Sequence, residues 1–430
     1  MKIHVGFAAF FSVAFASAAA RADAAAVFGQ GARSAGVARA DTAGGGAADA
    51  PRVNAALAAE PGTRVRLGYG YASLGLNFNG RDLGVAHVSG IELAVQGGGR
   101  VGKSVTIGAA LALHLPDPYL AAIAFRPATE PQFVLYEAPL QRTTVDFAAA
   151  VRVGPVAFGG GVAAGLGVGG AGTAFTLGQD GAGTFADAGL DVALPYRLAP
   201  LFGVRVALGR AVLAASIRGS TAIDLRLDNA VAIRLNDNPL NGTTEVRVRG
   251  AAGYDPATID VGARVAVGWG LSLLGAIEYA TYSAAPPPSA EVGIDVHLGT
   301  TPGLRAARIF EAGFHDTVSP RVGAELRRPS EGDAVWRWAV RAGYARVPSP
   351  VPEQYGFTTF LDSTRHEVAI GGGYHLGRLA GVDLAIEAAA QVHLLTARAG
   401  EKPSASLPYA RFESSGTIVH GAATLEAAWR

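Results

Sequence analysis

The sequence predicts an all-β protein, a transmembrane antiparallel β-barrel of about 14 strands. Three observations lead to this fold class. The chain opens on an export signal, half of its residues are hydrophobic although no interior segment suits a spanning helix, and apolar residues recur at every second position along much of its length.

The composition narrows the choice of fold. Of 430 residues, 50% are hydrophobic and only 17% are charged. A spanning helix needs roughly 20 mainly apolar residues. The longest uncharged run, residues 153–179, contains ten glycines and a proline and is poor helix material. Because backbone groups in hydrocarbon must be paired internally, a closed barrel is the remaining solution. The absence of cysteine excludes disulfides and thiolate sites, and a net charge of +1 gives no reason to expect a nucleic-acid partner.

Residues 1–24 form the predicted signal peptide. Lys2 supplies the positive start, residues 5–20 form an uninterrupted apolar run, and Ala20, Ala22 and Ala24 are small residues at the cleavage positions. No cysteine follows, so a lipoprotein anchor is not expected. Export together with a barrel predicts a multi-pass protein of the outer membrane of a Gram-negative bacterium.

The alternation is clearest in residues 103–115, where Val105, Ile107, Leu111 and Leu113 take one face and small or polar residues take the other. It recurs in roughly fourteen to seventeen segments, and residues 116–141 and 169–200 are expected to be long connections. A soluble β-sandwich would alternate too. Small residues on the polar face and aromatic residues near strand ends favour a barrel with an interfacial girdle. These aromatic residues are Tyr69, Tyr71, Trp269, Tyr279, Trp338, Tyr344, Tyr374 and Trp429.

Residues 25–60 do not alternate, and they are too short for a domain and too apolar for a periplasmic tail. Residues 31–36, 47–49 and 54–57 resemble, in order, the glycine-rich N-terminal hatch of the FadL family of long-chain fatty acid and hydrocarbon transporters. Shorter matches follow at residues 254–259, 277–283, 314–317, 341–344, 348–351 and 371–374. Ala55 stands where the family has proline, so a looser hatch turn is expected. The matched hatch residues are Gly31, Gly36, Asp49, Asn54, Ala55, Ala56 and Leu57.

The resemblance implies a hatch over residues 25–60 that plugs a barrel over residues 61–430. It implies passive transport of hydrophobic small molecules, such as fatty acids or hydrocarbons. Extracellular loops would capture the ligand, a dry apolar pocket in the lumen would bind it, and a kinked strand would release it sideways into the bilayer. The expected surroundings are a lipid bilayer and lipopolysaccharide, and the expected state is a monomer without cofactors.

Residues 116–140 are the candidate capture loop, because they are far more apolar than a solvated loop. Arg126 is suited to meet a carboxylate. The alternative is that part of this segment is another strand or packs on its own neighbours. The candidate ligand-binding residues are Tyr119, Leu120, Ile123, Phe125, Arg126, Phe133, Leu135 and Tyr136.

The sequence motifs do not predict an enzyme. Residues 165–170 satisfy G-x-G-x-x-G, but they lie in a strand-like alternation and lack the βαβ frame of a dinucleotide site. The histidines are scattered without a metal-ligand motif, and no metal or catalytic residue is predicted. Arg64 and Arg66 are expected on solvated faces rather than in the lumen. The alternative function is a general porin or a structural outer-membrane barrel that admits small polar solutes.

Overall fold

The protein is described by a computed structural model. The described residues are 24–83, 87–116, 129–136, 143–166, 169–180, 183–193, 196–234, 242–286, 291–298, 304–306, 313–329 and 336–429. The predicted signal peptide lies outside this range except for Ala24. None of the described helices is long and apolar enough to cross a membrane.

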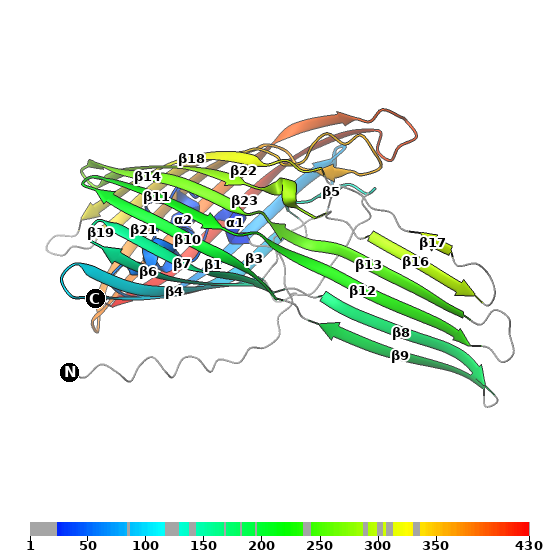
Figure 1. Cartoon of the computed structure of the whole chain (residues 1–430). Helices are drawn as coiled ribbons and strands as arrows, with labels where there is room; N and C mark the ends of the chain where they lie inside the picture. Colours follow the sequence, from blue (N-terminus) through cyan, green and yellow to red (C-terminus); the bar gives the residue numbers. More distant parts are fainter. Residues whose placement is uncertain are drawn as a thin grey trace.

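Fourteen antiparallel strands form a closed barrel, which confirms the predicted fold class (Figure 1). The barrel closes at β1, whose Leu67 pairs with Leu93 of β3 on one side and with Leu425 of β23 on the other. In barrel order the strands are β1 (Gly62–Phe78), β3 (His87–Val101), β4 (Val105–Pro116), β6 (Thr144–Val153), β7 (Val156–Leu166), β10 (Tyr196–Leu208), β11 (Ala211–Arg218), β14 (Thr258–Gly268), β15 (Leu271–Ala280), β18 (Thr317–Pro329), β19 (Trp336–Val347), β21 (Arg365–Leu379), β22 (Val382–Glu401) and β23 (Arg411–Trp429).

The outer surface of the barrel is apolar. Leu67, Leu93 and Leu425 lie side by side across three strands, and all three are exposed. The aromatic residues that predicted a girdle also point outward; seven of the eight are exposed, and Trp338 is half-buried. Leaving so much apolar surface in water is unfavourable, whereas hydrocarbon accommodates it. The closed barrel with this surface is that of a Gram-negative outer-membrane protein.

A second sheet extends beyond one end of the barrel (Figure 1). Residues 169–200, expected to be a connection, contribute two of its strands. Three further alternating segments, residues 221–234, 242–255 and 291–298, also belong to it rather than to the barrel. A two-residue alternation is common to both kinds of sheet, so it does not tell them apart. The strands are β8 (Gly169–Asp180), β9 (Gly183–Ala193), β12 (Thr221–Arg234), β13 (Gly242–Asp255), β16 (Glu291–Leu298) and β17 (Leu304–Ala306).

The long connections between barrel strands lie at the end of the barrel that carries this second sheet, which we call the loop end. The opposite turn end has tight connections such as residues 102–104 and 154–155. At the loop end, β5 (Gln132–Phe133) pairs in parallel with β20 (Phe360–Leu361). The remaining short elements are β2 (Arg81–Asp82), which pairs with β1, and the helical turn η4 (Tyr282–Ala284).

The N-terminal segment lies inside the barrel (Figure 1). It consists of α1 (Ala24–Phe28), α2 (Gly31–Gly36), η1 (Ala47–Asp49) and η2 (Ala55–Ala59). Helix α2 contacts β21, β22 and β23, η1 contacts β3 and β4, and η2 contacts β6, β7 and β10. We call residues 24–60 the hatch, because they contact strands on several sides of the lumen and are almost entirely buried there.

Candidate functional site

Glycines in the wall let the hatch backbone approach closely. A Cβ added at Gly108, Gly159 or Gly343 would overlap the backbone of Ala58, Ala55 or Val37, respectively. A Cβ at Gly262 would lie 2.8 Å from the Cβ of Thr42. These glycines therefore shape the lumen to the hatch, which explains why the inward faces of the strands are rich in small residues.

Buried ion pairs connect the hatch to the wall. Asp49 pairs with Arg66 of β1, and both side chains are almost fully buried. Arg33 lies 3.2 Å from Glu325 of β18, and Arg39 lies 3.3 Å from Glu367 of β21. The prediction that Arg66 lies on a solvated face is wrong, because its partner comes from the hatch rather than from its own sheet. Removing one member of such a pair leaves an uncompensated buried charge, which is strongly destabilising.

The hatch residues identified by the resemblance are all buried in the lumen. The Gly31 amide donates a 2.7 Å hydrogen bond to Glu92, and Gly36 packs against Gly371. Asn54 accepts a hydrogen bond from the Ala56 amide and donates to the carbonyls of Val204 and Ala215. The turn at Ala55 is thus held by the Asn54 side chain, and Ala55, Ala56 and Leu57 pack beneath it in η2.

Part of the candidate capture loop lies buried over the hatch at the loop end. Phe133 and Tyr136 pack with Phe28 of α1, and Leu135 is half-buried against them. The Tyr136 hydroxyl accepts a 3.0 Å hydrogen bond from Arg365. Tyr119, Leu120, Ile123, Phe125 and Arg126 lie outside the described residues. We call the buried apolar group the mouth cluster; it consists of Phe28, Ala72, Leu74, Leu76, Phe78, Val88, Phe133, Tyr136, Leu361, Leu395, Phe412 and Ile418.

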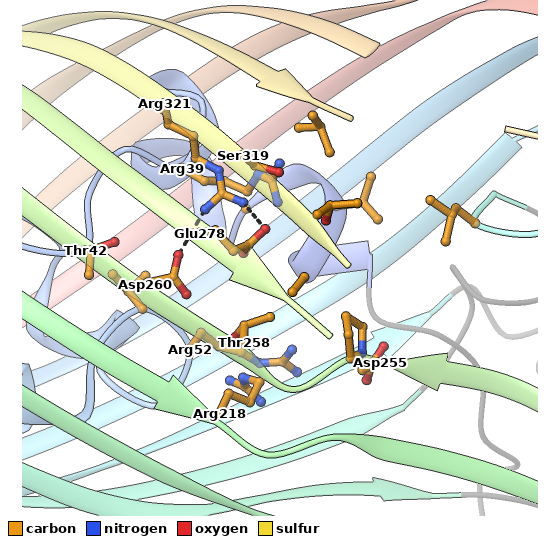
Figure 2. A pocket seen from close by; sticks show the side chains of 18 of the residues that line it. Arg39, Thr42, Arg52, Arg218, Asp255, Thr258, Asp260, Glu278, Ser319 and Arg321 are labelled. Atoms are coloured by element: carbon orange, nitrogen blue, oxygen red, sulfur yellow. Dashed lines mark hydrogen bonds and ion pairs between the residues drawn. The ribbon is translucent and has the colours of Figure 1, made fainter. Parts of the chain in front are cut away.

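A cavity of about 170 Å³ lies between the hatch and the wall formed by β11, β14, β15 and β18. Arg321 lies between two carboxylates (Figure 2). It is 3.3 Å from Asp260, and Glu278 is its second partner. The lining of the cavity includes many charged and hydroxyl side chains, whereas the resemblance implied a dry apolar pocket. The physical reason is that inward-facing polar residues from four strands converge with polar residues of the hatch. The labelled residues are Arg39, Thr42, Arg52, Arg218, Asp255, Thr258, Asp260, Glu278, Ser319 and Arg321.

Solved structures with this architecture exist, although no protein-family model and no curated protein matches the sequence. A FadL homologue from Pseudomonas aeruginosa is 11% identical with a TM-score of 0.54, and the match covers 96% of this chain and 99% of that one. The toluene transporter TbuX from Ralstonia pickettii is 13% identical with a TM-score of 0.50, covering 94% and 99%. The toluene transporter TodX from P. putida is 12% identical with a TM-score of 0.50, covering 93% and 98%.

The chain has the FadL-type fold. Within this fold, two buried groups at the loop end have shifted pKa values. Burial raises the pKa of the Tyr136 hydroxyl to about 12, although Arg365 opposes the shift. Burial also raises the pKa of the Asp362 carboxyl to about 6. Burial thus disfavours the charged form of both groups relative to the same groups in water, as expected for a poorly hydrated mouth.

Sequence reasoning located the hatch of this FadL-type fold but missed the charged cavity. Asp260 and Arg264 were visible as polar residues on an alternating strand. The partner of Asp260 in the cavity, Arg321, is distant in sequence. The sequence does show inward-facing charged residues on neighbouring strands. Which of them form pairs depends on the positions of these strands along the barrel axis, and the sequence alone does not give those positions.

Proposed function

We propose that the protein is a passive outer-membrane channel for hydrophobic compounds such as long-chain fatty acids. The observation that carries this proposal is the combination of a hatch bound across the lumen and a buried mouth cluster above it. A hatch held by glycine contacts and ion pairs opposes free flow of water and ions. The mouth cluster offers an apolar surface at the same place.

In this proposal the loop end captures the ligand. The aromatic residues Phe133 and Tyr136 already pack on Phe28 of the hatch, so a ligand that displaces them reaches the lumen directly. Burying an alkyl chain there contributes about 0.8 kcal/mol per methylene. The other proposed partners of the protein are the lipid bilayer and its lipopolysaccharide leaflet. We propose that the protein works as a monomer, because the closed barrel leaves no strand edge free to pair with a second copy. The solved structures named as toluene transporters support a hydrophobic substrate.

Release is proposed to be sideways, through the wall between β1 and β3. Gly70 and Gly90 face each other in register there, and neither has a side chain to fill the wall. A small cavity of about 20 Å³ lies behind them, lined by Phe28, His114 and His420 among others. The register of β3 against β1 and β4 shows no shift, so release requires a transient local opening rather than a permanent kink.

The charged cavity is the observation that favours the alternative, a porin for small polar solutes. A liposome assay distinguishes the two functions. Reconstituted protein should speed transfer of a fluorescent long-chain fatty acid into the vesicles and should not support swelling in small sugars. A variant lacking residues 28–58 should gain conductance in planar bilayers. Sugar swelling by the intact protein without fatty-acid transfer would establish the porin and reject the proposal.

A further inference from the structure

We propose that the charged cavity is a head-group site for amphiphiles whose polar head carries both a hydrogen-bond donor and an acceptor, such as a hydroxyacyl or N-acyl amide compound. This inference rests on the proposed transport function and specifies its substrate class. It follows from three polar atoms in the cavity lining, from the pairing of the surrounding charges, and from the apolar residues on one side of the cavity.

Among the described lining residues that form no ion pair, three have a buried side-chain atom without a hydrogen-bond partner. These atoms are Oε1 of Gln30, Oδ2 of Asp41 and Nε of Arg365. Their residues are 4%, 2% and 4% exposed. Two of these atoms accept hydrogen bonds and one donates, so the cavity presents both kinds of unmet bonding capacity. Leaving such atoms unpaired in a ligand complex is unfavourable, which makes them specificity determinants.

The other charged side chains of the cavity already have partners; Asp255, for example, accepts a 2.9 Å hydrogen bond from Thr221. Arg321 is flanked by Asp260 and Glu278, and Arg39 pairs with Glu367. Asp146 pairs with both Arg52 and Arg218. A ligand gains little from groups whose charges are balanced, so the cavity does not act as a general anion trap.

Arg365 differs from these arginines. No carboxylate lies within ion-pair distance of it among the described residues. Its Nη1 donates to the Tyr136 hydroxyl, and its guanidinium lies 5.8 Å from the centre of the Tyr136 ring. Arg365 therefore connects the charged cavity to the mouth cluster and keeps Nε available for an acceptor on the ligand.

The lining also gives the ligand an orientation. Val27 and Leu135 line the cavity and pack against the mouth cluster. A head group in the cavity can therefore continue into an alkyl chain that lies along these residues. The cavity volume of about 170 Å³ is far above the roughly 10–15 Å³ that a single water needs, so a small head group fits.

Hydrocarbons and unsubstituted fatty acids cannot form hydrogen bonds with all three of these atoms. A hydrocarbon pairs with none of the three atoms, and a carboxylate can accept from Arg365 but cannot donate to Asp41 or Gln30. A hydroxyl or an amide N–H next to a carbonyl or carboxylate supplies both. The site should therefore prefer a hydroxylated acid to the same acid without the hydroxyl group.

Calorimetric titration of the full-length mature protein in lipid nanodiscs tests the inference, with 3-hydroxydodecanoate and dodecanoate as probes. These probes share chain length and charge and differ in one hydroxyl. We expect the hydroxylated acid to bind at least tenfold more tightly. Asp41→Asn should reduce this preference to less than threefold, while Asp383→Asn, at the turn end beside Arg378, should keep it. If Asp41→Asn does not fold, Gln30→Leu serves as the second variant with the same expected loss of preference.

Equal affinities of the two probes for the wild-type protein, or a preference that survives in both variants, would overturn the inference. Transfer of a fluorescent long-chain probe into liposomes is measured in parallel. Normal transfer together with equal affinities rejects the head-group site and leaves the proposed function standing. Absence of both transfer and binding rejects the proposed function itself.

Discussion

Gly343 of β19 lies so close to the backbone of Val37 in the hatch that no side chain can be placed between them. The hatch and the wall therefore meet by backbone packing on this side of the lumen, and comparable contacts at Gly108 and Gly159 occur elsewhere around the barrel. The closure of the lumen depends on glycine positions as much as on the hatch sequence.

Replacing Gly343 with Val should displace the hatch while the barrel still forms. Overpacking a close contact costs about 1–3 kcal/mol or more, and the hatch is the smaller and less extensively hydrogen-bonded partner. We expect higher conductance in planar bilayers and unchanged heat-modifiable migration of the barrel on gels. Gly97→Val is the matched control, because a Cβ there meets nothing within 4 Å. Equal conductance of the two variants would show that the contact does not hold the hatch.

The ion pair between Asp49 and Arg66 should make a large contribution to the stability of the hatch. Asp49→Ala leaves Arg66 buried without this partner, and the expected loss is about 3–5 kcal/mol in the free energy of unfolding. Denaturant titration in micelles measures it. Glu401→Ala is the control, because Glu401 and its partner Arg411 are both exposed and the expected loss is below about 1 kcal/mol. Similar losses in the two variants would contradict a special role for the buried pair.

The barrel was predictable because the pattern that specifies it is local. Each strand repeats an outward apolar residue at every second position, as in residues 103–115, which correspond to β4. The second sheet was not separated from the barrel because its strands alternate in the same way. The cavity was out of reach for a different reason. Asp260 and Arg321 are 61 residues apart, and their meeting depends on the stagger of the barrel strands.

Tyr136 should contribute to ligand capture through its ring rather than through its hydroxyl group. Tyr136→Ser removes an aromatic side chain from the mouth cluster, so uptake of a fluorescent fatty acid should fall several-fold. Tyr136→Phe keeps the ring in the mouth cluster and loses only the hydrogen bond from Arg365. It should retain most of the uptake. Tyr355→Ser controls for loss of an exposed aromatic residue at the same end of the barrel. Normal uptake by Tyr136→Ser would remove this segment from the mechanism.

The mouth should be more tightly closed in acid than at neutral pH. Burial raises the pKa of Asp362 to about 6, above its value in the unfolded chain, so the folded state favours the protonated form. Stability from this group is full below about pH 4 and declines as the pH rises to about 6, a loss on the order of 3 kcal/mol.

Amide hydrogen exchange in residues 129–136 and 359–363, corrected for intrinsic rates, should therefore be slower at pH 4.5 than at pH 7.5. Asp362→Asn should abolish this difference. Glu401→Gln, an exposed carboxylate paired with Arg411, should leave it in place. Equal protection at both pH values in the wild-type protein would mean that Asp362 does not control the mouth.

The wall between β1 and β3 is the proposed exit, and filling it should block release without preventing binding. Gly70 and Gly90 both face the small cavity behind the wall, and a Cβ at Gly70 would lie 3.3 Å from the His420 ring. We expect Gly70→Leu to slow transfer of a fluorescent fatty acid to the liposome bilayer at least fivefold. The affinity of the variant for this fatty acid should change little. Gly97→Leu, on the neighbouring strand β3 and facing open space, should transfer at the wild-type rate. If the Gly70→Leu variant transferred the fatty acid at the wild-type rate, the ligand would have to leave through another part of the wall. If the variant also bound the fatty acid more weakly, Gly70 would belong to the binding site instead of the exit.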